Sequence, residues 1–344
     1  MRAAVFANPG SIEIQEVADP HIQESTDAVV KVTATCVCGS DLWYYRGLAD
    51  RESGARIGHE FIGEVVEAGS DVRNLKVGDF VIAPFKYSCG ECAHCKYGMT
   101  ANCSSGGIWG LRGVDGGQGQ YVRSPLADGT LVKVPGKPDR EMQRHLLALS
   151  DVACTGYHAA ISSRVKPGGT VAVVGDGAVG LSAVMSAAIL GAEIIFALST
   201  HEPRQQIAKR FGATTIVNAR GDEAKEIIKD LTDGVGVDSV MECVGTSQSS
   251  RTAFDILRPG GTIGTVGVPH GLEWPAGKMF TNNFNVAGGV APARAYIPAL
   301  LDKVLAGTIE PGIVFDYDFD FEDIQGAYEA MDARTGTKAI SFLD

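Results

Sequence analysis

A glycine-rich turn between an apolar run and a small-residue segment constrains this chain more than any other feature. Gly175-Asp176-Gly177-Ala178-Val179-Gly180 follows the strand-like run 170–174 and opens a helix expected over residues 178–190. In such a turn the first glycine permits a tight bend, the second lets a pyrophosphate approach the backbone, and the third lets helix and strand pack closely. The N-terminus of the helix adds partial positive charge. The turn therefore predicts a dinucleotide-binding site.

Alternating strands and helices follow this turn. Strand-like runs recur at 193–198, 214–218 and 284–289, and also after Gly236 and Gly260, and a helical segment precedes each of them except 284–289. Alternation of this kind forms right-handed βαβ units and a parallel sheet. A glycine-rich turn alone is a weak indication of a cofactor, but within these repeats the pattern is specific. Residues 153–290 are therefore expected to form a doubly wound Rossmann domain.

The end of the second strand of this domain bears on the choice of dinucleotide. NAD sites commonly place an acid there, which accepts a hydrogen bond from the ribose 2′-hydroxyl. Here the position holds Ser199, followed by Thr200 and His201, with Arg204 one turn further on. Hydroxyl and guanidinium donors suit a 2′-phosphate, although Glu202 opposes it unless its side chain points away. The pattern favours NADP over NAD.

The first 150 residues follow a different pattern. Short strand-like runs, among them 28–37, 62–69 and 79–84, are separated by Gly, Asp and Pro turns, which is typical of a β-rich domain such as a distorted barrel. After residue 290 the chain holds two helical segments and a strand-like tail, and the alternation stops. We therefore expect an α/β chain with two domains, a β-rich domain from residues 1–152 and 291–344 and the Rossmann domain between them.

Composition excludes several classes of protein. Of the 344 residues, 45% are apolar and 21% are charged, which is the balance of a soluble globular protein. A net charge of −11 repels phosphate backbones, so we expect no nucleic-acid partner. No apolar run approaches the roughly 20 residues that span a bilayer, and the N-terminus lacks a signal-peptide core. We expect a cytoplasmic protein with no membrane partner.

Four of the eight cysteines lie in one short lobe of about residues 86–106. In a reducing compartment, clustered cysteines indicate a metal rather than disulfides. Four closely spaced thiolates complete the tetrahedral shell of a zinc ion and leave no position for a substrate. Cys89, Cys92, Cys95 and Cys103 are therefore predicted to hold a structural zinc.

A second pair of metal-ligand candidates lies earlier in the chain. Cys38 begins the segment Cys-Gly-Ser-Asp after one strand, and His59 lies in the segment Gly-His-Glu before another. A catalytic zinc needs about three protein ligands and one open position. A single buried Cys is more often a core residue than a ligand, so the two residues are candidates because of their joint context.

The segments that begin at or near Cys38, His59, the four-cysteine lobe, Thr155 and Gly175 together resemble the zinc-dependent medium-chain alcohol dehydrogenases. They occur in the family's order over nearly the whole chain. The resemblance implies a GroES-like catalytic domain, a Rossmann cofactor domain and a cleft between them. It also implies two zinc ions per chain, a nicotinamide dinucleotide, a small-molecule substrate and a homodimer or homotetramer.

Carried over position by position, the resemblance assigns Cys38, His59 and Asp151 to a catalytic zinc. Glu60 would lie next to the metal and either enter its shell or tune it. Asp151 stands where relatives often have Cys, a pattern similar to the bacterial secondary-alcohol branch. Cys154, about one helical turn further on, is the alternative ligand.

The resemblance also implies roles beside the metal. Ser40 matches the hydroxyl that relays a proton from the buried alcohol, and Thr155 and Val244 would lie beside the cofactor. Many relatives have His three residues after this hydroxyl, whereas Trp43 has one N–H donor and no acceptor. The relay then ends early, runs through water or uses another group. Trp43 and Trp109 are expected to line an apolar, aromatic substrate pocket, although ordinary wall packing explains Trp43 equally well.

The sequence thus predicts a zinc-dependent enzyme that transfers a hydride reversibly between a secondary or aryl alcohol, or the matching carbonyl compound, and NAD(P). A polyol or sugar dehydrogenase of the same family is the main alternative and would need a more polar pocket. Zinc-free quinone or enone reduction would require the loss of metal ligands that are present. The non-enzymatic alternative is a catalytically silent protein that binds zinc and a nucleotide, and the intact ligand set with Ser40 argues against it.

Overall fold

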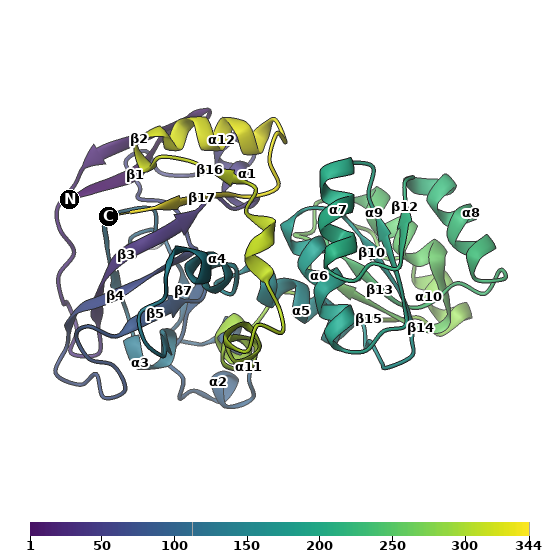
Figure 1. The fold of residues 1–344 in the computed structure, drawn as a ribbon, viewed down its shortest axis with the longest axis horizontal. Helices are drawn as coiled ribbons and strands as arrows, with labels where there is room; N and C mark the ends of the chain where they lie inside the picture. Colours follow the sequence, from purple (N-terminus) through teal and green to yellow (C-terminus); the bar gives the residue numbers. More distant parts are fainter. Residues whose placement is uncertain (112, 344) are drawn as a thin grey trace. The chain divides into compact units, whose positions relative to one another are not determined.

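The computed structural model describes residues 1–111 and 113–343. They form two units, one of residues 1–151 with 292–344 and the other of residues 152–291. Each unit has its own sheet (Figure 1). Each also has its own buried hydrophobic core.

Residues 152–291 are built on six parallel strands. The order across the sheet is β12-β11-β10-β13-β14-β15, so the chain starts in the middle at β10, moves to one edge and then crosses to the other side. The carboxyl ends of β10, β11 and β13 meet where the order reverses, which is where such sheets bind ligands. The doubly wound sheet expected from the sequence is confirmed. Its strands are β10 (Thr170–Val174), β11 (Ile194–Leu198), β12 (Thr215–Val217), β13 (Val237–Glu242), β14 (Leu257–Thr265) and β15 (Asn285–Gly288).

Helices cover both faces of this sheet. In Figure 1, α6 and α7 lie on one side and α8 and α10 on the other. Small and branched strand residues form the core together with Phe196, Phe254 and Phe284. The helices are α5 (Val152–Ser162), α6 (Ala178–Ile189), α7 (Glu202–Arg210), α8 (Gly221–Leu231), α9 (Ser247–Ile256) and α10 (Ala276–Asn282).

Residues 1–151 and 292–344 form a mainly antiparallel sheet in the order β16-β17-β3-β4-β5-β9, and β8 also pairs with β3. Two further antiparallel pairs, β1–β2 and β6–β7, lie outside it. The strands are β1 (Arg2–Asn8), β2 (Ser11–Glu16), β3 (Ala28–Cys36), β4 (Phe61–Ala68), β5 (Phe80–Ala83), β6 (Lys86–Tyr87), β7 (Gly107–Ile108), β8 (Tyr121–Ser124), β9 (Val132–Val134), β16 (Tyr317–Asp318) and β17 (Ala339–Phe342).

Short helices connect and flank these strands. Asp139 caps the N-terminus of α4 by accepting a hydrogen bond from the backbone N–H of Met142 at 2.8 Å, which satisfies one of the free donors of the first turn. The α-helices are α1 (Asp41–Tyr45), α2 (Ala93–Lys96), α3 (Ala127–Thr130), α4 (Arg140–Ala148), α11 (Ala293–Leu305) and α12 (Ile324–Asp332), and the 3₁₀ turns are Thr100–Asn102, Pro311–Val314 and Phe321–Asp323.

The register of three neighbouring strands decides which residues meet at one end of this sheet. In the antiparallel pair β3–β4, Thr35 lies opposite Phe61, so the residues that follow β3 emerge beside those that precede β4. In the pair β17–β3, Ile340 lies opposite Cys36. The residues just before β17, among them Lys338, therefore emerge at the same end.

The sequence pattern and the structure differ most at α10. No residue of this helix is buried, so it has no apolar period from which it could be predicted. The helix expected over 178–190, by contrast, lies at Ala178–Ile189, because its small apolar residues pack on the sheet. Among the described residues, no helix combines the length and the apolarity that crossing a bilayer would require.

Candidate active site and metal centres

Four potential metal ligands meet where β3 ends and β4 begins. Cys38 follows β3, His59 and Glu60 directly precede β4, and Asp151 lies in the turn between α4 and α5. One donor atom from each residue lies within 4.8 Å of the donors of the other three. The hydroxyl of Thr35 donates to the carbonyl of Glu60 at 2.8 Å, which fixes the junction between the two strands.

The separations between these donors suit a small tetrahedral ion. Cys38 Sγ lies 3.7 Å from Asp151 Oδ2, and His59 Nε2 lies 3.3 Å from the same oxygen. Around zinc, the usual bond lengths place a sulfur and an oxygen ligand about 3.6 Å apart and a nitrogen and an oxygen ligand about 3.4 Å apart. The three residues therefore fit a zinc ion, with one position of a tetrahedron left over.

Asp41 orients both of the ligands that the sequence motifs supply. One of its oxygens accepts the backbone N–H of Cys38 at 3.0 Å, and the other lies 3.2 Å from His59 Nδ1. A proton on Nδ1, held by this carboxylate, leaves the lone pair of Nε2 directed at the metal position. Asp41 is thus the outer partner that sets the histidine tautomer.

A buried ion pair lies beside the cluster. Lys338 Nζ is 2.7 Å from Glu60 Oε1 and 3.3 Å from the carbonyl oxygen of Val37, and both charged side chains are at most 2% exposed. Burial raises the pKa of Glu60, and the ammonium of Lys338 is the main counterweight. The second oxygen, Oε2, has no hydrogen-bond partner. Glu60 therefore keeps one free oxygen next to the metal position.

The electrostatics of the cluster also favour a bound cation. Burial and the nearby Glu60 raise the pKa of the Cys38 thiol. For His59, burial works against the charged ring, but Asp41 and Cys38 raise its pKa well above the ordinary value. Each of these shifts reflects acidic groups held close together out of water, and a divalent cation would balance their charge.

Ser40 lies between the metal ligands and a cavity of the same unit. Its hydroxyl is 3.4 Å from Cys38 Sγ and 3.5 Å from His59 Nε2. The cavity wall contains Ser40, Asp41 and His59. The other residues that line it are Phe6, Ile12, Tyr44, Arg51, Ile57, Gly58, Ile108, Trp109, Leu111 and Tyr328.

The two tryptophans expected to line the pocket have different environments. Trp109 lines the cavity, but it is 2% exposed, donates to the carbonyl of Pro84 at 2.7 Å and packs edge-on against Phe61. It is therefore a core residue with one edge at the cavity. Trp43 lies half-buried in α1 and is not among the lining residues. Arg51, which the sequence motifs do not mark, brings a guanidinium to the wall.

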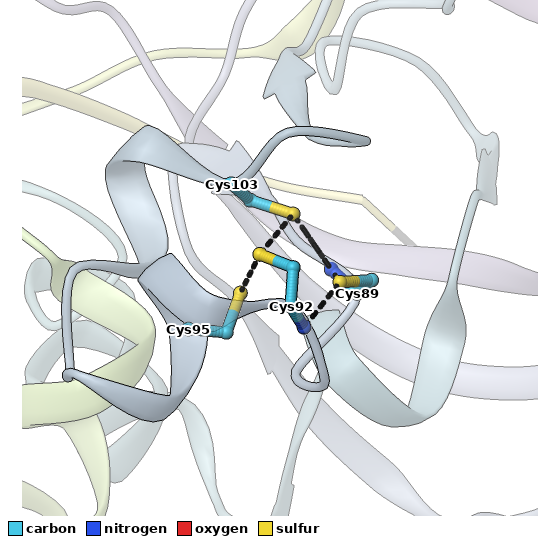
Figure 2. A group of neighbouring side chains, drawn as sticks. All are labelled: Cys89, Cys92, Cys95 and Cys103. Atoms are coloured by element: carbon cyan, nitrogen blue, oxygen red, sulfur yellow. Dashed lines mark hydrogen bonds between the residues drawn. The ribbon is translucent and has the colours of Figure 1, made fainter.

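The four cysteines of the lobe form a second group of side chains that could hold a metal ion (Figure 2). The sulfur of Cys103 lies 3.4 Å from that of Cys89 and 3.9 Å from that of Cys92, which lies 3.6 Å from that of Cys95. A tetrahedral zinc–thiolate site has sulfur separations of about 3.8 Å, whereas a disulfide would need about 2 Å. Figure 2 shows all four sulfurs turned toward a common centre.

Backbone N–H groups around the lobe donate to the cysteine sulfurs and so favour their thiolate forms. The N–H of Cys89 points at the sulfur of Cys103, and that of Cys92 points at the sulfur of Cys89, at 3.2 and 3.3 Å. Backbone donors at Cys95 and Ser104 lower the pKa of Cys92 to about 5, whereas burial raises that of Cys95 to about 12. Part of the site is thus ionised without a metal, and binding a cation would draw the remaining protons off.

The glycine-rich turn has the shape of a phosphate cradle. Gly175 has φ of 115°, and a Cβ on Gly180 would lie 2.0 Å from the carbonyl oxygen of Gly175, so both positions require glycine for the fold itself. Gly177 differs, since its φ is −74° and a Cβ there would meet nothing within 4 Å. No contact among the described residues requires a glycine at this N-cap, so the open space suits a ligand such as a pyrophosphate.

The remaining cofactor candidates lie around this turn or in the same unit. Ala178 and Val179 form the first turn of α6, and Val244 follows β13 with a methyl group 2.7 Å from the position of a Cβ on Gly175. Thr155 is half-buried in α5, in which Cys154, the alternative metal ligand, is buried. Ser199, Thr200 and His201 follow β11, and Arg204 lies in α7.

The structure adds an acid to the strand end where the sequence has none. Asp176 accepts a hydrogen bond from Ser199 Oγ at 2.8 Å, and its carboxylate also contacts His201 and Arg204. The predicted preference for NADP assumed that this position is free of negative charge. The carboxylate of Asp176, which belongs to the glycine motif, brings a negative charge to this position.

Comparisons with known proteins agree with this geometry. The family models "Alcohol dehydrogenase GroES-like domain" and "Zinc-binding dehydrogenase" match residues 24–136 and 178–306. Zinc-type alcohol dehydrogenase B of Aspergillus flavus is 37% identical over 349 aligned positions, which cover 99% of this chain and 81% of that protein. The structure of alcohol dehydrogenase TADH from Thermus sp. ATN1 has a TM-score of 0.93 at 30% identity, with 100% of both chains covered. Benzyl alcohol dehydrogenase from Acinetobacter calcoaceticus has a TM-score of 0.88 at 27% identity, covering 100% of this chain and 99% of that one.

Fold and site together define a medium-chain oxidoreductase with a GroES-like domain and a nucleotide-binding domain. The chain belongs to the zinc-type alcohol dehydrogenases. Membership implies zinc, a nicotinamide cofactor and a small-molecule substrate.

We predict that Cys92→Ser lowers stability by removing the lobe's metal. At sites of this kind the free energy of metal binding contributes to folding, and a loss of about 2 kcal/mol shifts the unfolding temperature of a domain of this size by roughly 4–8 °C. Differential scanning calorimetry and zinc analysis on the same sample measure both effects. Cys243→Ala, at a half-buried cysteine outside both clusters, serves as the control. An unchanged zinc content in Cys92→Ser would contradict the assignment.

A further prediction concerns the buried pair of Lys338 and Glu60. Lys338→Met leaves the carboxylate buried without its partner, which costs about 3–5 kcal/mol in the free energy of unfolding. Lys338→Arg keeps the charge, and the double variant Lys338→Met/Glu60→Gln removes the uncompensated ion, so both recover most of the loss. Denaturant unfolding of the four proteins tests this. Equal stability of wild type and Lys338→Met would show that the pair has no net effect.

Proposed function

We propose that the chain is an NAD(P)-dependent alcohol dehydrogenase that transfers a hydride reversibly between a secondary or aryl alcohol and the corresponding ketone or aldehyde. The observation that carries this proposal is the open donor set of Cys38, His59 and Asp151 with the Ser40 hydroxyl beside it. A closed four-ligand site would leave no position for a reacting oxygen, whereas three protein ligands leave one.

The side chains of the site divide the work as follows. Cys38, His59 and Asp151 would hold the catalytic zinc, while Asp41 fixes the imidazole of His59. Zinc and the nicotinamide, when bound, supply a Lewis acid and a hydride carrier. Ser40, in contact with two of the ligands, is placed to accept the proton of an alcohol held at the fourth position.

The proton's path beyond Ser40 does not use the residue found in many relatives. The sequence position that holds His in many relatives holds Trp43 here, and its indole has no acceptor atom. Tyr44 shares the cavity wall with Ser40, and its phenol can both donate and accept. We propose that the proton leaves through the cavity, by way of water or Tyr44.

The cavity wall supports aryl or secondary alcohols as substrates. Tyr44, Ile108, Trp109 and Leu111 offer flat and apolar surface, and a solved relative acts on benzyl alcohol, according to its name. The guanidinium of Arg51 in the same wall favours a second candidate, a polyol or sugar dehydrogenase, because it can bind a substrate hydroxyl.

We also propose a structural zinc in the four-cysteine lobe and a dinucleotide on the turn from Gly175 to Gly180. Ser199, Thr200 and Arg204 are donors suited to a 2′-phosphate and support NADP, whereas the charge on Asp176 opposes it. The protein is proposed to be a cytoplasmic homodimer or homotetramer. The eight cysteines form no disulfide, which suits a reducing compartment. Phe280 of α10 is a large apolar side chain that is 86% exposed, and burying it against a second subunit would be favourable.

Metal removal from one centre tests the catalytic assignment. Cys38→Ser and Asp151→Ala should each lower kcat by at least about a thousandfold, because the Lewis acid is lost, while dinucleotide binding measured by calorimetry stays within about threefold of wild type. Zinc analysis should give two ions per chain in the wild type and one in Cys38→Ser. Cys154→Ala should retain both ions. One zinc per chain in the wild type would refute the catalytic centre.

A substrate panel tests the reaction itself. Benzyl alcohol, a set of secondary alcohols, their carbonyl partners and several polyols are assayed with NAD and with NADP. Higher kcat/KM for aryl and secondary alcohols than for polyols supports the first candidate, and the reverse order supports the second. Absence of hydride transfer with every pair, in protein that carries two zinc ions, would contradict both.

A further inference from the structure

We propose that Asp176 is the specificity-determining residue for the cofactor ribose, because its carboxylate competes with a 2′-phosphate for the donors at the end of β11. This inference rests on the proposed function, since it assumes that a nicotinamide dinucleotide binds on the turn from Gly175 to Gly180. It assigns the choice between NAD and NADP to the variable position inside the glycine motif rather than to Ser199 at the strand end.

Asp176 reaches from one strand end to the next. It follows β10 within the glycine-rich turn, and β10 and β11 are parallel neighbours, with Val174 opposite Leu198. Because parallel strands end at the same edge of a sheet, residue 176 and residue 199 lie close together. The side chain of Asp176 therefore lies at the carboxyl end of β11, where dinucleotide sites of this fold recognise the 2′ position.

The carboxylate is held from both sides. Oδ2 accepts from Ser199 Oγ at 2.8 Å and lies 2.8 Å from His201 Nδ1, while Oδ1 lies 3.4 Å from Arg204 Nη1. Asp176 and Arg204 are only 14% and 13% exposed in their side chains. Ser199, His201 and Arg204 are thus already engaged by one internal anion.

Asp176 is ionised in this environment. Burial alone raises the pKa of its carboxyl, but the hydrogen bonds from His201 and Ser199 and the charge on Arg204 outweigh burial and lower the pKa below its usual value. An ionised carboxylate accepts hydrogen bonds and donates none, so the proton between Asp176 and His201 belongs to Nδ1.

Such a carboxylate treats the two cofactors differently. A ribose 2′-hydroxyl can donate to it, as to the acid that many NAD sites carry at this strand end. A 2′-phosphate would be repelled by it and would have to take Ser199 and Arg204 away from it. The acid missing from the sequence of β11 is therefore supplied by the neighbouring turn, and the site favours a free 2′-hydroxyl.

The substitution Asp176→Asn tests the proposal, because asparagine has nearly the same shape without the charge. Isothermal titration calorimetry on the zinc-loaded protein measures Kd for NAD and NADP, and for 5′-AMP and adenosine 2′,5′-bisphosphate, two fragments that differ only in the 2′-phosphate. We expect the variant to shift the ratio of the two Kd values toward the phosphorylated ligand by on the order of tenfold in both pairs.

Asp238→Asn provides a matched control. Asp238 also pairs with an arginine, Arg258, at 2.6 Å and accepts the backbone N–H of Thr170 at 2.8 Å, but it lies near the start of β13, at the opposite edge of the sheet. This variant removes one negative charge from the same unit and should leave the ratio within about twofold of wild type.

The outcomes are separable. If wild type binds none of the four ligands, the proposed function fails. If wild type binds them and Asp176→Asn leaves the ratio unchanged, or shifts it no more than Asp238→Asn does, the inference about Asp176 is wrong. Since both ligands are titrated into one preparation, the ratio does not depend on the fraction of folded protein, and a loss of stability would not mask the result.

Discussion

The antiparallel pairing of β3 with β4 is the constraint on which the proposed catalytic centre depends. It brings Cys38, at the end of one strand, beside His59 and Glu60, at the start of the next, although about 20 residues separate them in the chain. Neither residue alone can bind a metal tightly. The backbone ladder, and the bond from Thr35 to the carbonyl of Glu60, hold the ligands in place before any ion arrives, so metal binding does not have to order them.

The same sheet also places a positive charge beside the acidic groups that the pairing of β3 with β4 brings together. Cys38, Glu60 and Asp151 are three acidic groups in one small volume, and two side chains outside the ligand set stabilise it. Lys338 reaches Glu60 because β17 pairs with β3. Asp41 is itself acidic, but its carboxylate is paired with Nδ1 of His59 and holds the imidazole ring in place. A metal ion bound by the proposed ligands would complete this balance. The pair Lys338–Glu60 thus contributes to the electrostatics of the site although Lys338 is not a ligand.

Local motifs make much of the site predictable. The glycine-rich turn, the four-cysteine lobe and the segments around Cys38 and His59 are short, and their chemistry depends on residues close in sequence. Lys338 and Asp176 were not predictable in the same way. Lys338 belongs to no sequence motif. It bonds to Glu60, from which 278 positions separate it in the chain, because β17 pairs with β3. Asp176 occupies a position where the motif accepts any residue, so its contact with Ser199 depends on the order of the strands.

The sequence by itself determined the fold class, the family resemblance and the residue types at both metal centres, because strand–helix alternation and ligand spacing are local properties of the chain. Only the tertiary structure decided which partners surround those residues. Strand register placed Lys338 against Glu60, and packing against Phe61 of β4 and Tyr87 of β6 made Trp109 a core residue with one edge at the cavity. The parallel neighbours β10 and β11 put a carboxylate where the sequence at the end of β11 has only a serine. Contacts between distant segments are set by register and packing, which no local pattern encodes.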